Sequence, residues 1–213
     1  MTTAPGKTRA GHGPSGSRGG RTRGRLLEAA VELLEEGGYA SASVAAIASR
    51  AGVAVGALYR HFPSKAEFFV EIVREMADRE LAALGETSAR EAGAVAEKLD
   101  AIVAKFTHRA LAQPRLAWAL GYEPVDPLVD AERLAYRQTY RERLASLLRH
   151  GISSGELPAQ DADLAAAAVI GAISEALASP LSPVRGVDVP AERIVVALQE
   201  FCRRAIGARD PSR

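Results

Sequence analysis

AGVAVGALYRHFPSK, residues 51–65, contains a glycine turn, a short helical segment and a Pro-Ser stop. A short helix is predicted before it, from Ser43 to Arg50, with Ser43 as its N-cap. Gly52 supplies the tight turn to a further helix, expected from Ala54 to His61. Two short helices joined by a glycine turn form a helix-turn-helix candidate, whose second helix enters the major groove of DNA. This end of the chain is therefore predicted to bind DNA.

The segments on either side support the same arrangement. Leu and Ala recur at helical spacing from Leu26 to Leu34, and the pair of glycines at 37–38 ends this first helix. Ser64 and Glu67 have the spacing of a capping box, so a long fourth helix is expected to start there and to reach about residue 84.

The rest of the chain has helical period and no strand pattern, so the expected fold class is all-α. The segment 164–178 is apolar nearly all round and must be buried on several sides, in a core or between subunits. The single cysteine, Cys202, falls in an apolar helical stripe and is expected to be buried. The remaining predicted helices cover residues 89–112, 114–122, 130–150, 164–178 and 191–206.

Charge is distributed unevenly. The net charge of the chain is +1, yet residues 1–25 carry six basic side chains and no acidic one, which leaves −5 on the remainder. Residues 1–20 are rich in Gly, Ser, Thr and Pro, so we expect a flexible basic arm. Such an arm either contacts nucleic acid or is a solvated tail, and both alternatives stay open.

Residues of about 21–70 resemble the N-terminal domain of TetR-family transcriptional regulators. The family pattern of Ile-Ala-x-x-Ala-Gly-Val followed by Leu-Tyr-x-x-Phe-x-x-Lys is met over some fifty residues, about a quarter of the chain. Beyond that segment the agreement is limited to length, helix order and the apolar penultimate helix. The matching positions are Ile47, Ala48, Ala51, Gly52, Val53, Leu58, Tyr59, Phe62 and Lys65.

The resemblance implies an Ω-like homodimer with two parts in each subunit. Residues 21–66 would form the helix-turn-helix DNA-binding domain, and residues 67–207 a helical effector-binding and dimerisation domain. The helices 164–178 and 191–206 would pair across the dimer. A small effector, bound among the middle helices, would release the protein from operator DNA, so a repressor is expected.

The segment departs from the family where the recognition helix meets DNA. Ala54 and Ala57 stand where Ser or Thr is common, so base reading is expected to lean on Arg60, on DNA shape and on arginines of the arm such as Arg18. Val55 and Ala57 would contact thymine methyl groups. The candidate DNA-binding residues are Arg21, Arg23, Ser43, Val55, Gly56, Ala57, Tyr59, Arg60, His61 and Lys65.

The middle helices supply candidate effector-binding residues, and the sequence favours an apolar or amphipathic ligand. Trp118, the only indole, is the first candidate because it lies in a short Pro-initiated helix at a domain junction. Glu175 lies in an apolar run and is expected to pair with an Arg, to meet a ligand or to reach the surface at the dimer rim. The candidates are Phe106, Arg115, Trp118, Tyr122, Tyr136, Tyr140 and Glu175.

Other functional classes find little support. The four histidines lack metal-ligand spacing, and no glycine loop follows a strand, so neither catalysis, a metal nor a cofactor is expected. No window reaches about 18 uninterrupted apolar residues, which favours a cytoplasmic protein without a membrane contact. Two alternatives remain: a dimeric helical carrier of small molecules that does not read an operator, and a regulator without an effector.

Overall fold

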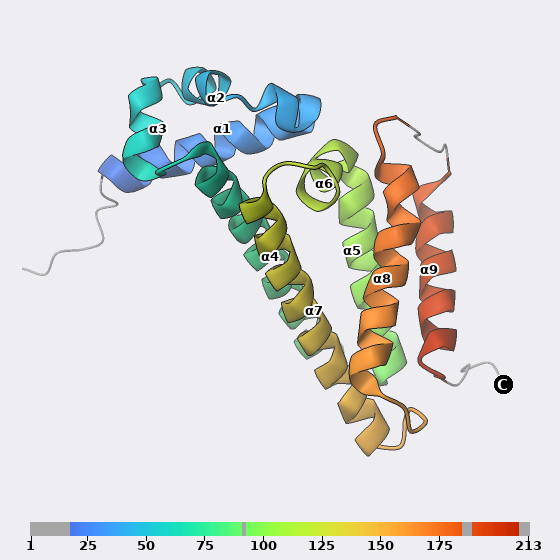
Figure 1. The fold of residues 1–213 in the computed structure, drawn as a ribbon. Helices are drawn as coiled ribbons and strands as arrows, with labels where there is room; N and C mark the ends of the chain where they lie inside the picture. Colours follow the sequence, from blue (N-terminus) through green and yellow to red (C-terminus); the bar gives the residue numbers. More distant parts are fainter. Residues whose placement is uncertain (1–17, 91–92, 185–188, 209–213) are drawn as a thin grey trace, which may run out of the picture.

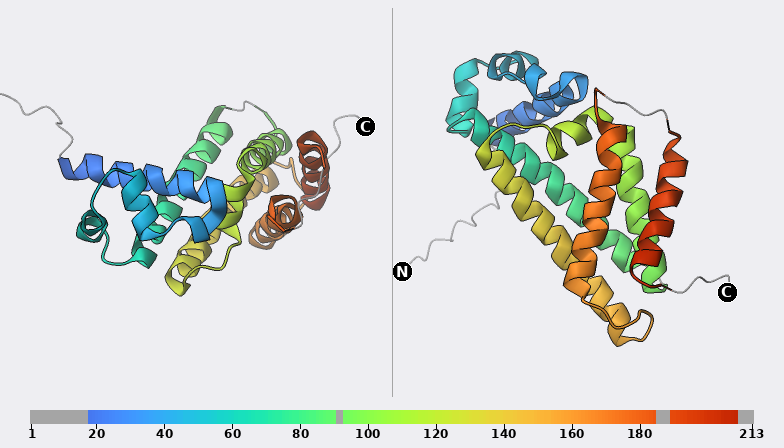
Figure 2. Two further views of the ribbon diagram at one scale, coloured as in Figure 1. Left: turned by 90° about the horizontal axis from the view of Figure 1, so that it is seen from above. Right: turned by 45° about the vertical axis from the view of Figure 1, so that its right-hand side comes forward.

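The computed structural model describes residues 18–90, 93–184 and 189–208 (Figure 1). Within these residues the chain is all-α, which confirms the expected fold class. Helices α1–α3 gather at one end, and the helices α4, α5, α7, α8 and α9 form the larger body (Figures 1 and 2). The helices are α1 (Arg18–Ser41), α2 (Val44–Arg50), α3 (Val55–His61), α4 (Lys65–Arg90), α5 (Val95–Ala112), α6 (Pro114–Gly121), α7 (Pro127–Ser153), α8 (Ala162–Leu181) and α9 (Ala191–Ala205).

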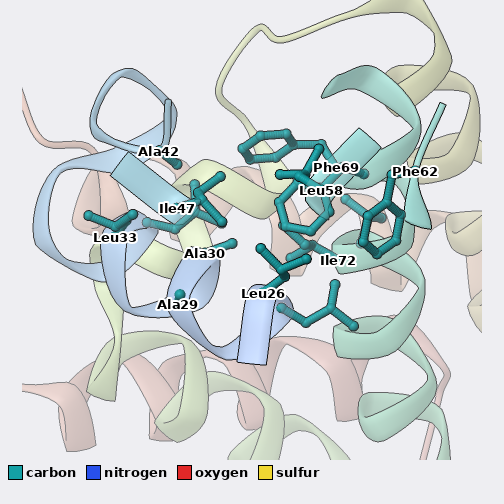
Figure 3. Packing of buried hydrophobic residues seen from close by; sticks show 14 of the residues in the cluster. Leu26, Ala29, Ala30, Leu33, Ala42, Ile47, Leu58, Phe62, Phe69 and Ile72 are labelled. Carbon is teal, nitrogen blue, oxygen red and sulfur yellow. The ribbon is translucent and has the colours of Figure 1, made fainter. Parts of the chain in front are cut away.

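The first hydrophobic core holds α1, α2 and α3 against the start of α4 (Figure 3). Leu26, Ile47, Leu58 and Phe68 are fully buried there. The rings of Phe62 and Phe68 pack edge to face, with centroids 4.7 Å apart. Side chains from α6 and α7 join the same cluster, so the end that is expected to bind DNA shares its core with the body.

The second core joins α5, α7, α8 and α9. Val103, Leu148, Ala166 and Cys202 are buried within it, which confirms the burial expected of the cysteine. The Arg203 guanidinium on α9 pairs with the Asp100 carboxylate on α5 and so ties the two helices together. Removal from water also raises the pKa of the Cys202 thiol to about 11.

Several helix boundaries differ from the sequence-based expectation. The first helix starts at Arg18, within the segment expected to be arm. The fourth helix runs to Arg90, and the next begins at Val95 rather than at residue 89. The N-terminus of α5 is capped at this position, because a Glu156 carboxylate oxygen accepts a hydrogen bond from the Val95 N–H at 2.7 Å. Residues 1–17 of the expected arm lie outside the described residues.

The expected boundary between domains, at residues 66 and 67, falls in the first turn of α4. The N-terminal half of α4 lies in the core of the DNA-binding end, with Phe68, Phe69 and Ile72. Farther along, Glu80 and Leu84 of the same helix line a cavity in the body. One continuous helix therefore connects the two parts.

Candidate DNA-binding surface and internal cavity

The turn between α2 and α3 is built as the sequence predicts. Gly52 has a φ of +62°, a conformation that costs a residue with a Cβ about 1–2 kcal/mol. The Ser43 hydroxyl accepts a hydrogen bond from the Ala46 N–H at 3.1 Å and caps α2. Arg25 of α1 donates to the carbonyl oxygen of Ala51 and thereby fastens the turn, a role the sequence-based interpretation missed.

The helix α3 has one buried face and one exposed face. Ala57 and Leu58 are buried against the core, while Val55, Tyr59 and Arg60 project into solvent. The expectation that the Ala57 methyl contacts thymine therefore needs correction, because that methyl is only 3% exposed. The exposed strip that α3 offers to DNA consists of Ala54, Val55, Gly56, Tyr59 and Arg60, with His61 half-buried at its end.

The basic candidates beside α3 have different surroundings. Arg21 is exposed. Arg23 pairs with Glu71 of α4, and its guanidinium carbon lies 5.6 Å from the centroid of the Phe62 ring. Arg23 is thus held against the body of the protein.

Lys65 packs on aromatic rings at the start of α4. Its amine lies 4.2 Å from the centroid of the Tyr39 ring and 5.5 Å from that of Phe69. Partial removal from water lowers the pKa of this amine. The charge of Lys65 sits at the first turn of a helix, where free backbone N–H groups favour an anion.

An internal cavity of about 910 Å³ lies among α4, α5, α6, α7 and α8. This volume is at the upper end of the range of small-molecule sites. Along α7 the lining runs from Arg133 to His150, which at 1.5 Å per residue corresponds to about 25 Å. The cavity is therefore elongated, and about half of its lining residues are aliphatic.

Charged and hydroxyl groups interrupt this apolar wall. The Nε of Arg109 on α5 lies 2.9 Å from a carboxylate oxygen of Glu80 on α4. Burial raises the pKa of the Glu80 carboxyl, and the nearby Arg109 and Lys105 charges oppose that rise. Burial also raises the pKa of Tyr140 on α7, helped by the negative charge of Glu80. Glu80 and Arg109 were not among the sequence-derived candidates, because charges on amphipathic helices usually face solvent.

Four of the seven effector candidates come together in this cavity, namely Phe106, Tyr122, Tyr136 and Tyr140. The other three, Arg115, Trp118 and Glu175, are absent from its lining, and Arg115 and Glu175 are exposed. The Trp118 ring instead stacks on the outside of Tyr122, with centroids 5.2 Å apart. Glu175 is exposed on α8 in the single chain, and its place at a dimer rim stays a prediction.

The helix α6 connects the cavity wall to the DNA-binding end. Leu116 of α6 lines the cavity and also belongs to the first core. At the end of α6, a carboxylate oxygen of Glu123 accepts a hydrogen bond from the Tyr39 N–H at 3.0 Å. Arg133 of α7 donates to the Ala119 carbonyl at 2.6 Å and to the Glu123 carbonyl at 2.8 Å. Direct contacts therefore join the cavity wall to α1.

The outer faces of α8 and α9 expose apolar side chains. Leu164 is 69% exposed, Val196 50% and Phe201 45%, and Gly171 on α8 is also exposed, with nothing within 4 Å of the place of a Cβ. By length and composition alone α8 could cross a membrane, the one such helix among the described residues. Its inner residues, Ala166 among them, are instead packed in the second core.

Two family models match the chain. The model described as "Bacterial regulatory proteins, tetR family" matches residues 26–72. The model described as "Tetracyclin repressor-like, C-terminal domain" matches residues 92–177. The first match covers α2, α3 and the turn between them, and the second covers most of the helices that line the cavity.

Similar proteins are transcriptional regulators. An uncharacterized HTH-type transcriptional regulator of Mycobacterium tuberculosis is 47% identical over 60 residues, which is 28% of this chain and only 31% of that protein. The HTH-type transcriptional repressor KstR of Mycolicibacterium smegmatis is 31% identical over 139 residues, covering 65% of this chain and 66% of KstR. A crystal structure of FadR from Bacillus subtilis in complex with stearoyl-CoA superposes with a TM-score of 0.73 at 23% identity, covering 87% of this chain and 98% of FadR, and shows the common fold.

Proposed function

The chain belongs to the tetR family of bacterial regulatory proteins, not to an enzyme family, and on this premise we propose that it is a DNA-binding repressor controlled by a small-molecule effector. The observation that supports the proposal most is the exposed strip of α3 in the helix-turn-helix. The helix-turn-helix shares its core with α6, which also lines the cavity. Its site of action would be the cytoplasm, where operator DNA is found.

DNA would be read by α3 in the major groove. Arg60 is the only side chain of the exposed strip with the bidentate geometry that recognises guanine. Val55 is 45% exposed and suits contact with a thymine methyl. Arg21, the Ser43 hydroxyl, Tyr59, His61 and Lys65 would contact phosphate, while Arg23 would have to leave Glu71 to do so.

A homodimer would form through the exposed faces of α8 and α9. Three large apolar side chains there are 45–69% exposed, and a patch of this kind marks a protein interface. The small residues Ala168 and Gly171 allow a second helix to approach closely. A Leu164→Glu variant should therefore sediment as a monomer, whereas Leu134→Glu on α7, at an equally exposed leucine, should remain dimeric.

The effector would occupy the elongated cavity and would be amphipathic, with a long apolar part. The aliphatic lining and the extent of about 25 Å along α7 support this class. The similar FadR structure contains stearoyl-CoA, a ligand with a long acyl chain. Because α6 forms both the cavity wall and part of the first core, occupancy would shift α1 and with it α3.

The carrier alternative is separated from this proposal by salt dependence. A regulator with four phosphate contacts loses about 100-fold in DNA affinity between 50 and 200 mM salt. Affinity would be measured by fluorescence anisotropy with duplexes from the DNA beside its gene and with shuffled duplexes. Preferential, salt-sensitive binding of the native duplexes is expected, and absence of DNA binding at both salt concentrations would favour the carrier.

A further inference from the structure

The cavity contains a polar cluster about halfway along α7, formed by Glu80, Arg109 and Tyr140. The side chains come from three helices, α4, α5 and α7, so their meeting depends on the tertiary fold. Phe106 and Tyr136, with ring centroids 6.5 and 5.7 Å from that of Tyr140, hold the Tyr140 ring in place. Aliphatic residues such as Val103 and Leu144 line the cavity nearby.

The Tyr140 hydroxyl is the distinctive member of this cluster. It is buried and has no hydrogen-bond partner within the described part of the chain. Leaving a buried hydroxyl unpaired is unfavourable, because the group has lost its hydrogen bonds to water and gained none in return. Tyr122 provides a contrast in the same cavity, because its hydroxyl donates to the Ser174 carbonyl oxygen at 2.5 Å. The wall therefore contains one tyrosine hydroxyl that is satisfied and two, those of Tyr140 and Tyr136, that have no hydrogen-bond partner within the described residues.

The charges beside Tyr140 restrict what it can bind. The opposite charges of Glu80 and Arg109 lie within 2.9 Å and compensate each other. A ligand group with a full charge would have to disrupt this pair, whereas a neutral oxygen would not. A hydroxyl or carbonyl oxygen can pair with the Tyr140 hydroxyl, as a donor or as an acceptor.

We propose that this cluster is a recognition subsite for a neutral oxygen, a hydroxyl or a carbonyl, carried partway along an elongated apolar effector. The proposal rests on the proposed function, because it concerns the ligand of the same cavity. It narrows the effector from any amphipathic molecule to one that is oxygenated within its apolar part. The unpaired hydroxyl then makes a site that discriminates against the plain hydrocarbon analogue.

The test compares two probes that differ by one hydroxyl group, stearate and 12-hydroxystearate, by titration calorimetry with the full chain. One hydrogen bond is expected to make 12-hydroxystearate bind about 3- to 10-fold more tightly. In Tyr140→Phe the preference should be lost, so that stearate and 12-hydroxystearate bind with about equal affinity. The matched variant Tyr122→Phe also removes a tyrosine hydroxyl from the cavity. It should keep the preference for 12-hydroxystearate, even if it binds both probes more weakly than the parent does.

Three outcomes would overturn the proposal: equal affinity of the parent for both probes, binding of neither probe, or a preference that persists in Tyr140→Phe. Tyr140→Phe removes only an unpaired group, so its melting temperature should equal or exceed that of the parent. A lower melting temperature would also contradict the proposal, because it would show that the hydroxyl is already satisfied. DNA binding measured without any probe tests the proposed function separately, so the two failures are distinguishable.

Discussion

The Glu123 carboxylate accepts a hydrogen bond at 3.0 Å from the backbone N–H of Tyr39, a residue 84 positions earlier in the chain. This bond joins the segment after α6 to the end of α1, directly after the glycines that end its regular part. Because α6 also lines the cavity, the bond lies between the cavity wall and the helix-turn-helix end of the protein.

Replacing Glu123 by alanine should lower the free energy of unfolding by about 1–3 kcal/mol, because the partly buried Tyr39 N–H loses its charged acceptor. Urea unfolding would measure this. Glu142→Ala is the matched control, since Glu142 is exposed and accepts a hydrogen bond from the Gln138 side chain of its own helix. Equal stability of both variants would show that the Glu123 contact does not join the two parts.

Gly38 should tolerate no side chain. Its φ is +70° and its ψ is −163°, a region that costs other residues about 1–3 kcal/mol. A Cβ would also lie 2.9 Å from a carboxylate oxygen of Glu123. Gly38→Ala should therefore lower the melting temperature. Gly24→Ala, in helical α1 with nothing within 4 Å of its Cβ, should raise it, and the opposite order would contradict the described end of α1.

Arg60→Ala should weaken specific DNA binding by about 1–3 kcal/mol and relax sequence preference, because Arg60 is the guanine-reading candidate of α3. Competition between native and shuffled duplexes would measure both effects. Arg149→Ala also removes one positive charge, but from an ion pair with Asp163 on the body, and should leave preference unchanged. If the Arg60→Ala protein still preferred the native duplex over the shuffled one as strongly as the parent does, Arg60 would be excluded from base reading.

Glu80 should make stability fall as pH rises through the acid range. Burial raises its pKa above the usual 4.5, so the native state keeps this proton to higher pH than the unfolded state does. Its contribution is therefore complete below pH 4.5 and is lost as pH rises through the native pKa. The stability of the parent minus that of Glu80→Gln should decrease across this window.

Glu36 provides a control of opposite sign for this measurement. Its side-chain hydrogen bonds with Arg50 lower its pKa below 4.5. The parent should therefore lose stability relative to Glu36→Gln as pH falls through the native pKa of Glu36. A difference between parent and Glu80→Gln that stayed constant, or that increased with pH, would show that Glu80 is not desolvated in the cavity.

Local features of the DNA-binding end could be predicted from the sequence. The turn at Gly52 and the cap at Ser43 depend on residues within a few positions of each other, so the pattern contains them. The orientation of Ala57 was predicted wrongly, because a helix of seven residues is too short for its apolar pattern to fix which side is buried.

The cavity could be predicted only in part. Tyr136 and Tyr140 were found from their aromatic character and helical spacing, and both line it. Glu80 and Arg109 were missed, because their meeting depends on how α4 and α5 cross. Trp118 was the first candidate, yet the neighbouring turn, with Tyr122, forms the wall. Helical period shows that a face is apolar, but not whether that face meets a core, a cavity or another subunit.

The most direct test of the central claim is a footprint of the protein on the DNA beside its own gene, with competitor DNA present. A dimer that places two α3 helices in successive major grooves should protect two symmetric half-sites about 10 base pairs apart, or a multiple of that spacing. Protection without symmetry, or no protection of any preferred site, would contradict an operator-reading dimer.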